Sequence, residues 1–414
     1  LSGTCSVTGI FDVQGGRLDE APIGEEVLVL LNASPFYGES GGQVGDHGIL
    51  DNDTCKFEVF DTQKQGEVLI HRGVMQTGAL RVGDQLSAHV AEVDRLAITL
   101  NHSATHLMHA ALRNILGEHV TQKGSLVDAD RLRFDFSHST PVTEEELKQV
   151  EAQVNHEILA NSIVEKEVMP ISEAKTKGAL ALFGEKYGDE VRVVTMGGEY
   201  SVEFCGGCHV NRTGDIGLFK VASETGISAG VRRIEAVTGK GALTLVENEE
   251  QTLKQIMGVV NSGPLELVER VQQLAASNRT LEKQLGQLKA KMASSVGDEL
   301  ASQVIEINGT QVLVATLEKF NSKSLRDTVD RLKNKLGTTV IVLASINDGK
   351  VDLVVGVSKD LTKKVTAGDL ANMVAEQIGG KGGGRPDMAM AGGNDVSAVP
   401  SALESVKPWL EGKL

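Results

Sequence analysis

The segment EFCGGCHVNRTGDIG, residues 203–217, places Cys205, Cys208 and His209 within five residues. Taken as Cys-x-x-Cys, this spacing is typical of a redox dithiol, and taken as Cys-x-x-Cys-His it is typical of a covalent haem attachment site. Taken as Cys-x-x-x-His, it supplies half of a metal site. Other parts of the sequence distinguish between these three interpretations.

A pair of histidines about a hundred residues upstream favours the metal interpretation. The segment NHSATHLMH carries His102 and His106 four residues apart, inside a helix predicted over residues 92–116. Side chains four residues apart lie on one face of a helix, so both imidazoles can reach one ion, and His109 lies on nearly the same face. The two segments together offer nitrogen and sulfur donors that suit tetrahedral zinc. The four candidate ligands are His102, His106, Cys205 and His209.

The two other interpretations fit the sequence less well. Haem attachment would require export, but the start LSGTCSVTGIF has neither the basic end nor the apolar core of a signal peptide. A thioredoxin-like dithiol needs its first cysteine at the start of a helix, whereas this motif continues into the turn-rich VNRTGDIG. Four cysteines without a secretion signal indicate a reducing, cytoplasmic location. Whether Cys208 joins the metal site stays open, as does whether the zinc is catalytic or structural.

The composition is that of a soluble globular protein of several domains. The chain has 414 residues, of which 41% are hydrophobic and 23% are charged. No apolar run approaches the roughly 20 residues that span a bilayer, so no membrane partner is expected. The net charge of −15 argues against broad attraction to nucleic acids, although it leaves room for a local basic patch. Every cysteine and histidine lies at or before His209, so metal chemistry is expected in the first half.

The pattern along the chain predicts an α+β protein in several parts. Short strands separated by turns are followed by the helix over 92–116, which ends at Gly117 and carries apolar residues from Leu96 to Ile115 at helical spacing. Thr143 and Glu146 form a capping box for a second helix. The predicted parts are a β-rich, barrel-like region at 1–92, a zinc-binding α+β region at 93–246, a helical or coiled-coil linker at 247–296 and a small α/β domain at 297–414.

The linker carries leucines in a heptad pattern. Leu267, Leu274, Leu281 and Leu288 are seven residues apart, which predicts either a short coiled coil or an amphipathic helix packed on its own domain. After it, strands and helices alternate, with helices expected near 322–336 and 366–378. Two glycine-rich segments stand out: SPFYGESGGQVGDHG at 34–48, interpreted as a hairpin, and GGKGGGRPDMAMAGG at 379–393, interpreted as a loop.

Seven ordered motifs resemble the editing domain of alanyl-tRNA synthetases and its free-standing relatives. The C-terminal half is also similar to this family, in a helical linker and in a domain whose glycine-rich loop is shared with some DHH-type phosphoesterases. The resemblance covers essentially the whole chain and identifies it as the C-terminal portion of a bacterial-type alanyl-tRNA synthetase. The seven motifs are SPFYGESGGQVGD, NHSATHLMHAAL, VTQKGSLV, ALFGEKYG, CGGCH, RTGDIG and GVRRIEAVTG.

The resemblance implies a hydrolase that removes serine or glycine from mischarged tRNA(Ala). It implies one zinc ion per chain on the four candidate ligands, with Thr105 and Gln122 lining the editing pocket and Gln43 in the matching glycine motif. ATP and Mg²⁺ would belong to a catalytic domain that precedes this region, in agreement with a start without methionine. The family commonly has a small hydroxyl residue where this chain has Cys208, which puts the single-thiolate description in doubt.

The expected tRNA contacts are basic residues in two places. Arg232 and Arg233 are candidates for binding the tRNA end, with an ion-pair role as the alternative, and Lys381 and Arg385 are flanked by glycines that let the backbone approach phosphate. A homodimer through the C-terminal half is a further expectation. Two alternatives to a synthetase fragment remain open: a free-standing editing protein, and a non-catalytic module in which zinc holds structure and the chain binds tRNA or dimerises.

Overall fold

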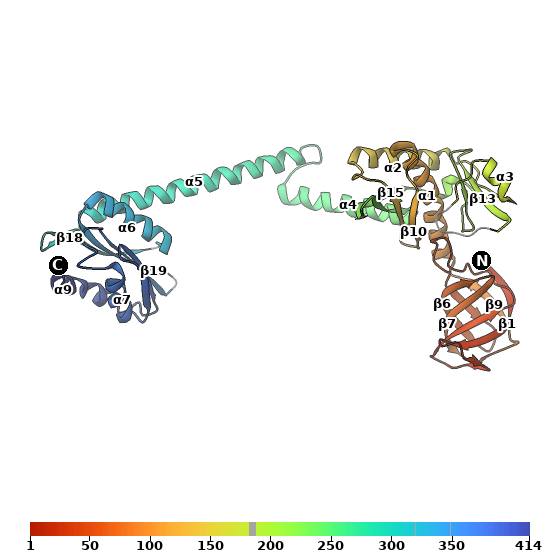
Figure 1. The fold of residues 1–414 in the computed structure, drawn as a ribbon, viewed down its shortest axis with the longest axis horizontal. Coiled ribbons are helices and arrows are strands. Elements are labelled where there is room, and N and C mark those ends of the chain that lie inside the picture. Colours follow the sequence, from red (N-terminus) through yellow and green to blue (C-terminus); the bar gives the residue numbers. More distant parts are fainter. Residues whose placement is uncertain (182–187, 319, 348) are drawn as a thin grey trace. The chain divides into compact units, whose positions relative to one another are not determined.

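The chain forms two compact units, Leu1–Ile256 and Met257–Leu414. The structure is a computed structural model that describes residues 1–181, 188–318, 320–347 and 349–414, and of residues 289–298 it describes only the backbone. Both units combine helices and strands, which confirms the predicted α+β class (Figure 1). None of the helices in this described part of the chain has the length and apolar character required to cross a membrane. The boundary between the units falls inside the predicted linker, and the division into four parts stays a prediction.

A closed β-barrel forms the first part of the N-terminal unit. Its strands are β1 (Ser2–Asp12), β4 (Glu26–Leu31), β7 (Val68–Thr77), β6 (Lys56–Gln65), β5 (Gly48–Asp51) and β9 (Gln85–Val90), in the order of their pairing. The ring closes because β1 pairs with both β4 and β9. Residues of β6 alternate between buried and exposed, so Phe57 and Val59 point into the barrel. Three short strands complete this part: β2 (Arg17–Leu18), β3 (Glu20–Ala21) and β8 (Leu80–Arg81).

A fully buried histidine, His71, lies among the apolar side chains of the barrel. Its Nδ1 donates to the carbonyl oxygen of Val29 at 3.1 Å, and its Nε2 accepts from the Ser34 hydroxyl at 2.7 Å. Burial lowers the pKa of His71 to about 4, against the opposing effect of the hydrogen bond to Val29. The imidazole is therefore neutral at physiological pH and serves the structure of the barrel.

The glycine-rich segment 34–48 fastens the barrel to the neighbouring sheet. It makes a tight turn in which Ser40 pairs with Gln43, in agreement with the predicted hairpin, and φ is +83° at Gly42. The backbone N–H of Val127 donates to the Gly42 oxygen at 2.7 Å. A Cβ at Gly45 would lie 2.1 Å from the Thr62 oxygen, so only glycine permits this approach. The turn delivers the Gln43 side chain, which is fully buried, toward the centre of the unit.

The remainder of the N-terminal unit is built around one long helix. The helices are α1 (Glu92–Leu116), α2 (Glu144–Ala160), α3 (Ile171–Thr176) and the short 3₁₀ helix η1 (Thr213–Ile216). A four-stranded antiparallel sheet has the order β10 (Gln122–Val127), β11 (Leu132–Ser137), β16 (Val231–Thr238) and β15 (Phe219–Ser228). A three-stranded sheet has the order β12 (Glu165–Pro170), β13 (Glu190–Met196) and β14 (Ser201–Phe204). The predicted helix over 92–116 is confirmed, and so is the capping box of Thr143 and Glu146.

Helix α1 is buried on all sides along its second half. Every residue from Asn101 to Leu112 is buried, because α2 and the four-stranded sheet pack against this stretch. Leu96, expected on the apolar face, is instead 58% exposed, since burial begins only at Ile98. A helix enclosed in this way can carry polar side chains at its centre only where they find partners.

Two helices follow, α4 (Gly239–Val260) and α5 (Leu267–Ala301). The heptad leucines of α5 stay largely exposed, with exposed fractions of 43% for Leu274, 62% for Leu281 and 59% for Leu288. The packed-helix alternative is therefore not met along this part of α5. The coiled coil stays a prediction that the single chain does not test.

The C-terminal unit is a six-stranded sheet with helices on both faces. The strand order is β17 (Ile305–Ile307), β18 (Thr310–Glu318), β19 (Thr339–Asn347), β20 (Lys350–Val357), β22 (Met388–Gly393) and β21 (Lys381–Arg385). Helix α6 (Ser322–Leu336) packs on one face, and α7 (Ala367–Gln377), α8 (Val399–Glu404) and α9 (Val406–Glu411) pack on the other. Strands β18 and β19 are parallel, and the other neighbours are antiparallel.

The glycine-rich segment 379–393 is a hairpin of this sheet, not the predicted loop. Its Lys381–Arg385 part is the edge strand β21, paired residue by residue with β22. The glycines permit close contact with neighbouring backbone, since a Cβ at Gly380 would lie 1.6 Å from the Gly392 oxygen. The composition suggested irregular structure, but the backbone hydrogen bonds of the sheet override that preference.

Candidate metal centre

The four predicted ligands lie together at the centre of the N-terminal unit. His102 and His106 come from α1, and Cys205 and His209 come from the turn that follows β14. One ligand atom of each lies within 4.8 Å of the others, and all four side chains are buried. The Cys205 Sγ is 3.1 Å from His209 Nε2 and 3.5 Å from His102 Nε2. The prediction that these residues can share a metal ion is thus confirmed, while the identity of the ion is not fixed by the geometry.

Each histidine of the cluster has its Nδ1 held by a neighbouring oxygen. The partners are Gln43 Oε1 for His102 at 2.7 Å, Glu203 Oε2 for His106 at 2.7 Å and Ser103 Oγ for His209 at 3.2 Å. Ser103 donates its own proton to the Thr99 carbonyl, so its oxygen is free to accept from the imidazole. Such partners fix the tautomer with the proton on Nδ1, which leaves Nε2 for a metal.

An orphaned nitrogen tests whether a metal fits. The Nε2 of His106 is buried and has no hydrogen-bond partner among the residues described. A buried polar atom without a partner costs about 1–3 kcal/mol, so such atoms call for an explanation. A cation bound between the three imidazoles and the thiolate would satisfy this one, and nitrogen and sulfur donors are the ligands that zinc prefers.

The turn between the two later ligands depends on a glycine. A Cβ at Gly207 would lie 2.1 Å from His102 Cε1, whereas one at Gly206 would meet nothing within 4 Å. Arg192 Nη1 donates to the Gly207 oxygen at 2.6 Å, and Lys166 Nζ donates to the His209 oxygen at 2.9 Å. These bonds hold the turn against α1, close enough for both of its ligands to reach the cluster.

The charges in the cluster favour a thiolate. Burial raises the pKa of Cys205, but the imidazoles around it lower the pKa further, to well below its usual value. Burial also lowers the pKa of His106, and the charges of Glu203 and Cys205 outweigh this and raise it to about 10. Glu203 is 2% exposed, and its two imidazole neighbours hold its pKa below the usual range despite burial. A metal must therefore displace a proton from His106 when it binds.

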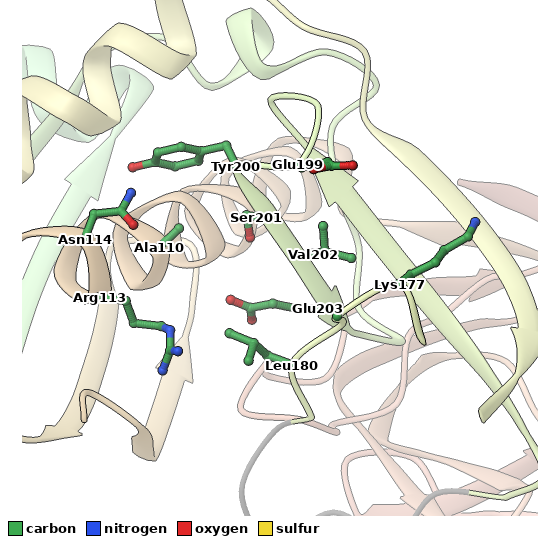
Figure 2. Close-up of a pocket in the computed structure, with 11 residues that line it drawn as sticks. Ala110, Arg113, Asn114, Lys177, Leu180, Glu199, Tyr200, Ser201, Val202 and Glu203 are labelled. Carbon is green, nitrogen blue, oxygen red and sulfur yellow. The ribbon is translucent and has the colours of Figure 1, made fainter. Parts of the chain in front are cut away.

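Two adjoining pockets, each of about 310 Å³, lie beside α1. Glu203 is part of the wall of the first pocket, and Figure 2 shows its carboxylate extending from β14 toward α1. The wall of the second pocket includes His109 and Gln122. Arg113 and Leu180 line both pockets, so the two adjoin. The second pocket therefore has in its wall both Gln122, which was predicted to line the editing pocket, and His109, which lies next to the metal cluster.

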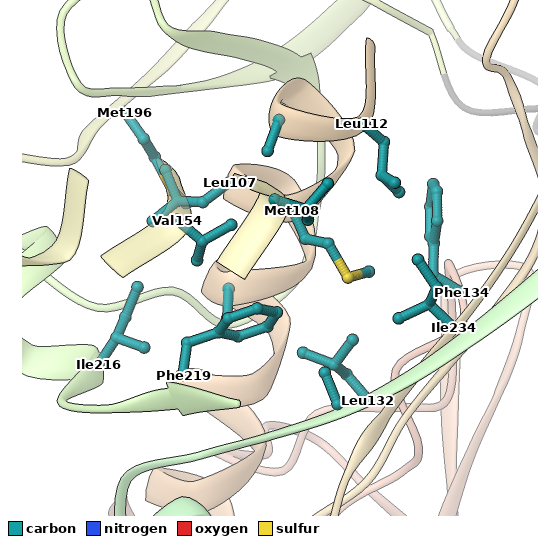
Figure 3. Close-up of a cluster of buried hydrophobic side chains, with 14 of the residues drawn as sticks. Leu107, Met108, Leu112, Leu132, Phe134, Val154, Met196, Ile216, Phe219 and Ile234 are labelled. Atoms are coloured by element: carbon teal, nitrogen blue, oxygen red, sulfur yellow. The ribbon is translucent and has the colours of Figure 1, made fainter. Parts of the chain in front are cut away.

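The other face of α1 packs against the main hydrophobic core of this unit. Leu107, Met108 and Leu112 are fully buried, and Figure 3 shows them among side chains from the four-stranded sheet and α2, including Phe134 and Val154. Truncating such a side chain to alanine costs about 2–5 kcal/mol. The ligands on α1 are thus held in place by packing as well as by hydrogen bonds.

The predicted substrate residues occupy different positions around the cluster. Gln43 orients His102 and also accepts from the backbone N–H of Cys208 at 2.9 Å. Thr105 is buried, and its Oγ1 donates to the Asn101 oxygen at 2.9 Å. It is not among the described residues that line the two pockets beside α1. Only Gln122, on β10, lines one of them. Their roles in catalysis stay predictions.

The cysteines bear on the alternative interpretations of the motif. All four cysteines of the chain are free thiols. Cys205 joins three histidines, whereas Cys208 is not part of the group that can hold a metal ion, judged over the described residues. This arrangement favours the metal interpretation over a redox dithiol. The motif ALFGEKYG, residues 181–188, lies for the most part outside the described residues.

The two candidate tRNA-binding arginines of this unit already have partners. Arg232 makes two hydrogen bonds to Glu224, at 2.5 and 2.6 Å, and Arg233 makes two to Asp135, at 2.7 and 2.8 Å. The ion-pair alternative therefore accounts for both guanidinium groups. Any contact with tRNA would have to add to these bidentate pairs or replace them.

The roles of three residues around the cluster were not predicted from the sequence. Glu203 and Cys205 are two residues apart, and the alternation along β14 was the signal that could have placed them on one face. His109 was noted only for its place on the helix, but its Nδ1 donates to Glu203 Oε1 at 2.8 Å. The role of Ser103 had no signal in the sequence, because it depends on a loop more than a hundred residues away.

Three known families match separate parts of the chain. Residues 1–94 match the family described as tRNA synthetases class II (A), and residues 309–412 match the DHHA1 domain. Residues 191–235, which include Cys205 and His209, match the threonyl and alanyl tRNA synthetase second additional domain. Together the matches define the class of protein: the chain is similar to class II aminoacyl-tRNA synthetases that carry this second domain.

Curated relatives narrow the class further. The alanine–tRNA ligase of Saccharophagus degradans is 54% identical over 412 residues, which are 100% of this chain and 47% of that protein. The alanine–tRNA ligase of Paraburkholderia phytofirmans is 53% identical over 403 residues, which are 97% of this chain and 46% of that protein. The chain is thus homologous to alanine–tRNA ligases over its whole length, which confirms the resemblance seen in its motifs. It spans about half the length of the curated relatives it matches.

One solved structure is similar to part of the chain. The C-Ala domain of the Aquifex aeolicus alanyl-tRNA synthetase is 29% identical, with 26% of this chain and 98% of that domain covered and a TM-score of 0.26. A TM-score this low carries no argument about the fold. The family assignment rests on the sequence matches.

Proposed function

We propose that this chain hydrolyses the ester bond of tRNA(Ala) that carries serine or glycine in place of alanine. The observation that carries the proposal is the buried group of three imidazoles and one thiol, which Glu203 links through His109 to the pocket that Gln122 lines. The homology to alanine–tRNA ligases supplies the substrate class. The second additional domain matched by residues 191–235 contains half of the cluster.

The chemistry of the amino acids explains why such an activity is needed. A pocket that selects alanine distinguishes it from glycine or serine by one methyl or one hydroxyl group. A difference of this size is worth about 1–3 kcal/mol, which is too little for accurate charging of tRNA. A second site that hydrolyses the wrong products removes the errors.

Zinc is the ion that the donor set fits best, and Cys205 Sγ with the Nε2 atoms of the three histidines would hold it. When bound, zinc supplies a Lewis acid that polarises an ester carbonyl or a water molecule. Gln43 and Glu203 orient two of the imidazoles. Thr105 uses its hydroxyl proton on the helix backbone, so its oxygen can accept a hydrogen bond from a serine side chain. Gln122 contributes its amide to the pocket wall.

For the C-terminal unit we propose binding to the body of tRNA. Lys381 and Arg385 are exposed on the edge strand β21, and the basic residues Lys323, Arg326 and Arg331 are exposed on α6. The alternative is pairing of two chains, which is favoured by the exposed heptad leucines of α5. These two roles do not exclude each other.

The test of the proposed function is deacylation by the purified chain without ATP. We expect hydrolysis of Ser-tRNA(Ala) and Gly-tRNA(Ala), with Ala-tRNA(Ala) left intact, and loss of the activity after removal of the metal by a chelator. Cys205→Ala should lose both zinc and activity. Cys208→Ala is the matched control and should keep both, since Cys208 is not among the grouped ligands. Binding of tRNA without any hydrolysis would instead support the non-catalytic module.

A further inference from the structure

His109 lies behind the metal cluster and shares a carboxylate with one of its ligands. Glu203 accepts hydrogen bonds from His106 Nδ1 at 2.7 Å and from His109 Nδ1 at 2.8 Å. A carboxylate only accepts hydrogen bonds, so both imidazoles donate from Nδ1 to Glu203, and in the neutral form of each ring Nε2 is then the acceptor. One carboxylate thereby sets the same tautomer in two histidines. In His106 this tautomer leaves Nε2 for the metal. The Nε2 of His109 is not part of the metal cluster, so any ligand it binds must be a different one.

The Nε2 of His109 is available for a ligand. His109 is 5% exposed, and its Nε2 is buried with no hydrogen-bond partner in the described part of the chain. The ring is fixed in place, because it packs on Phe134 with ring centres 5.1 Å apart while Glu203 holds its other nitrogen. A rigid ring with one unsatisfied acceptor is a prepared binding group.

The same ring forms part of the wall of the pocket that contains Gln122. His102, Thr105, His106 and His109 occupy positions i, i+3, i+4 and i+7 of the helix, so they follow one stripe of α1. The stripe begins at the metal ligands and ends at this pocket. A substrate with its ester at the metal would therefore extend along the stripe toward His109.

We propose that His109 is a substrate-binding residue whose Nε2 accepts a hydrogen bond from a hydroxyl group of the aminoacylated ribose end. This inference rests on the proposed function, which supplies such a substrate. Two hydroxyl groups have the required chemistry: the serine side chain, and the ribose hydroxyl next to the ester. Both are donors, and the lone pair of Nε2 is an acceptor of matching kind.

Two substitutions separate the two nitrogens of His109. Asparagine can place its amide N–H near the position of Nδ1, so His109→Asn keeps a donor for Glu203 and loses the acceptor in the pocket. Glutamine can place its amide oxygen near Nε2, so His109→Gln keeps an acceptor there and loses the bond to Glu203. His156→Asn is the control, because His156 is exposed on α2.

The experiment measures zinc content, hydrolysis and binding in the full chain loaded with zinc. We expect His109→Asn to keep one zinc per chain and the wild-type melting temperature, but to lose about ten- to a hundredfold in kcat/KM for Ser-tRNA(Ala). His109→Gln should retain more activity than His109→Asn, and His156→Asn should match the wild type. Wild-type kcat/KM in His109→Asn, or loss of its zinc, would overturn the proposal, since the residue would then be idle or purely structural.

Binding of non-hydrolysable amides tests the contact apart from catalysis. The probes are 3′-serylamino-adenosine, 3′-glycylamino-adenosine and the 2′-deoxy form of the seryl compound. If His109→Asn weakens only the two seryl probes by about tenfold, the partner is the serine hydroxyl. If it weakens both probes that retain the 2′-hydroxyl and spares the deoxy form, the partner is the ribose. Equal affinity of wild type and variant for all three probes would refute the contact, even where hydrolysis is observed; weaker binding without any hydrolysis would support it while the proposed function fails.

Discussion

Replacing Glu203 with glutamine should weaken metal binding without a change in shape. The carboxylate accepts from two imidazoles at once, whereas an amide has one accepting oxygen and one donating nitrogen. One of the two histidines must then face an N–H group and move its own proton to Nε2. If that histidine is His106, the nitrogen needed by the metal is blocked.

The expected size of the effect follows from the partner that is lost. Loss of such a hydrogen bond to a metal-ligating histidine reduces metal affinity about 10- to 100-fold. A broken hydrogen bond to a charged group costs the metal-free protein a further 1.5–3 kcal/mol, roughly. Zinc affinity can be measured by competition with a chromophoric chelator, and stability by urea unfolding. Glu199→Gln is the control, since Glu199 is exposed in the turn before β14. Zinc affinity of Glu203→Gln within twofold of the wild type would refute the reasoning.

Three further predictions concern other parts of the chain. Gly207→Ala should lower the zinc content, because its Cβ would lie 2.1 Å from a histidine of the cluster, whereas Gly206→Ala should keep it; metal analysis of both variants is the check. The free energy of unfolding should fall by up to about 3 kcal/mol as the pH drops from 6.5 to 4, because the unfolded chain takes up a proton on His71 that the folded barrel excludes. His71→Gln should flatten this pH dependence in urea titrations, and an unchanged slope would assign it to other groups. Lys381→Ala with Arg385→Ala should weaken tRNA binding and reduce the salt slope of log Kd by roughly two, and an unchanged slope would exclude this contact.

The local patterns of the sequence predicted the secondary structure well where one strong signal acted alone. The helix over 92–116, its end at Gly117 and the capping box at Thr143 follow from spacing and from individual side chains, and the structure has all three. The edge strand Lys381–Arg385 could not be predicted in this way, because its glycines have no strand preference and the sheet imposes the conformation.

In the candidate site too, the residues with a local sequence signal could be predicted and those that depend on distant contacts could not. The spacing alone indicates a metal site here, because two histidines lie four residues apart on a helix and a cysteine lies four residues before a histidine. The cluster of four ligands could therefore be predicted. Glu203 acts through contacts with residues 94 and 97 positions away; strand alternation could place it on the same face as Cys205, but it does not identify those two partners. Arg232 and Arg233 show the converse, since the sequence left open whether they bind tRNA or form ion pairs, and carboxylates from other strands pair with both.

The edge strand β21 has a consequence for the behaviour of the protein at high concentration. It is the edge strand of the six-stranded sheet, where the Gly382 N–H already donates to Asn372 Oδ1 at 3.0 Å, and its three consecutive glycines offer no side chains to obstruct pairing with another β-strand. Lys381 puts a positive charge at one end of this strand, and Arg385, which also pairs with Asp387 at 3.3 Å, puts one at the other end, so two copies that approached edge to edge would bring like charges together. The same two residues would then oppose self-association of the chain through this edge, independently of any role in binding tRNA.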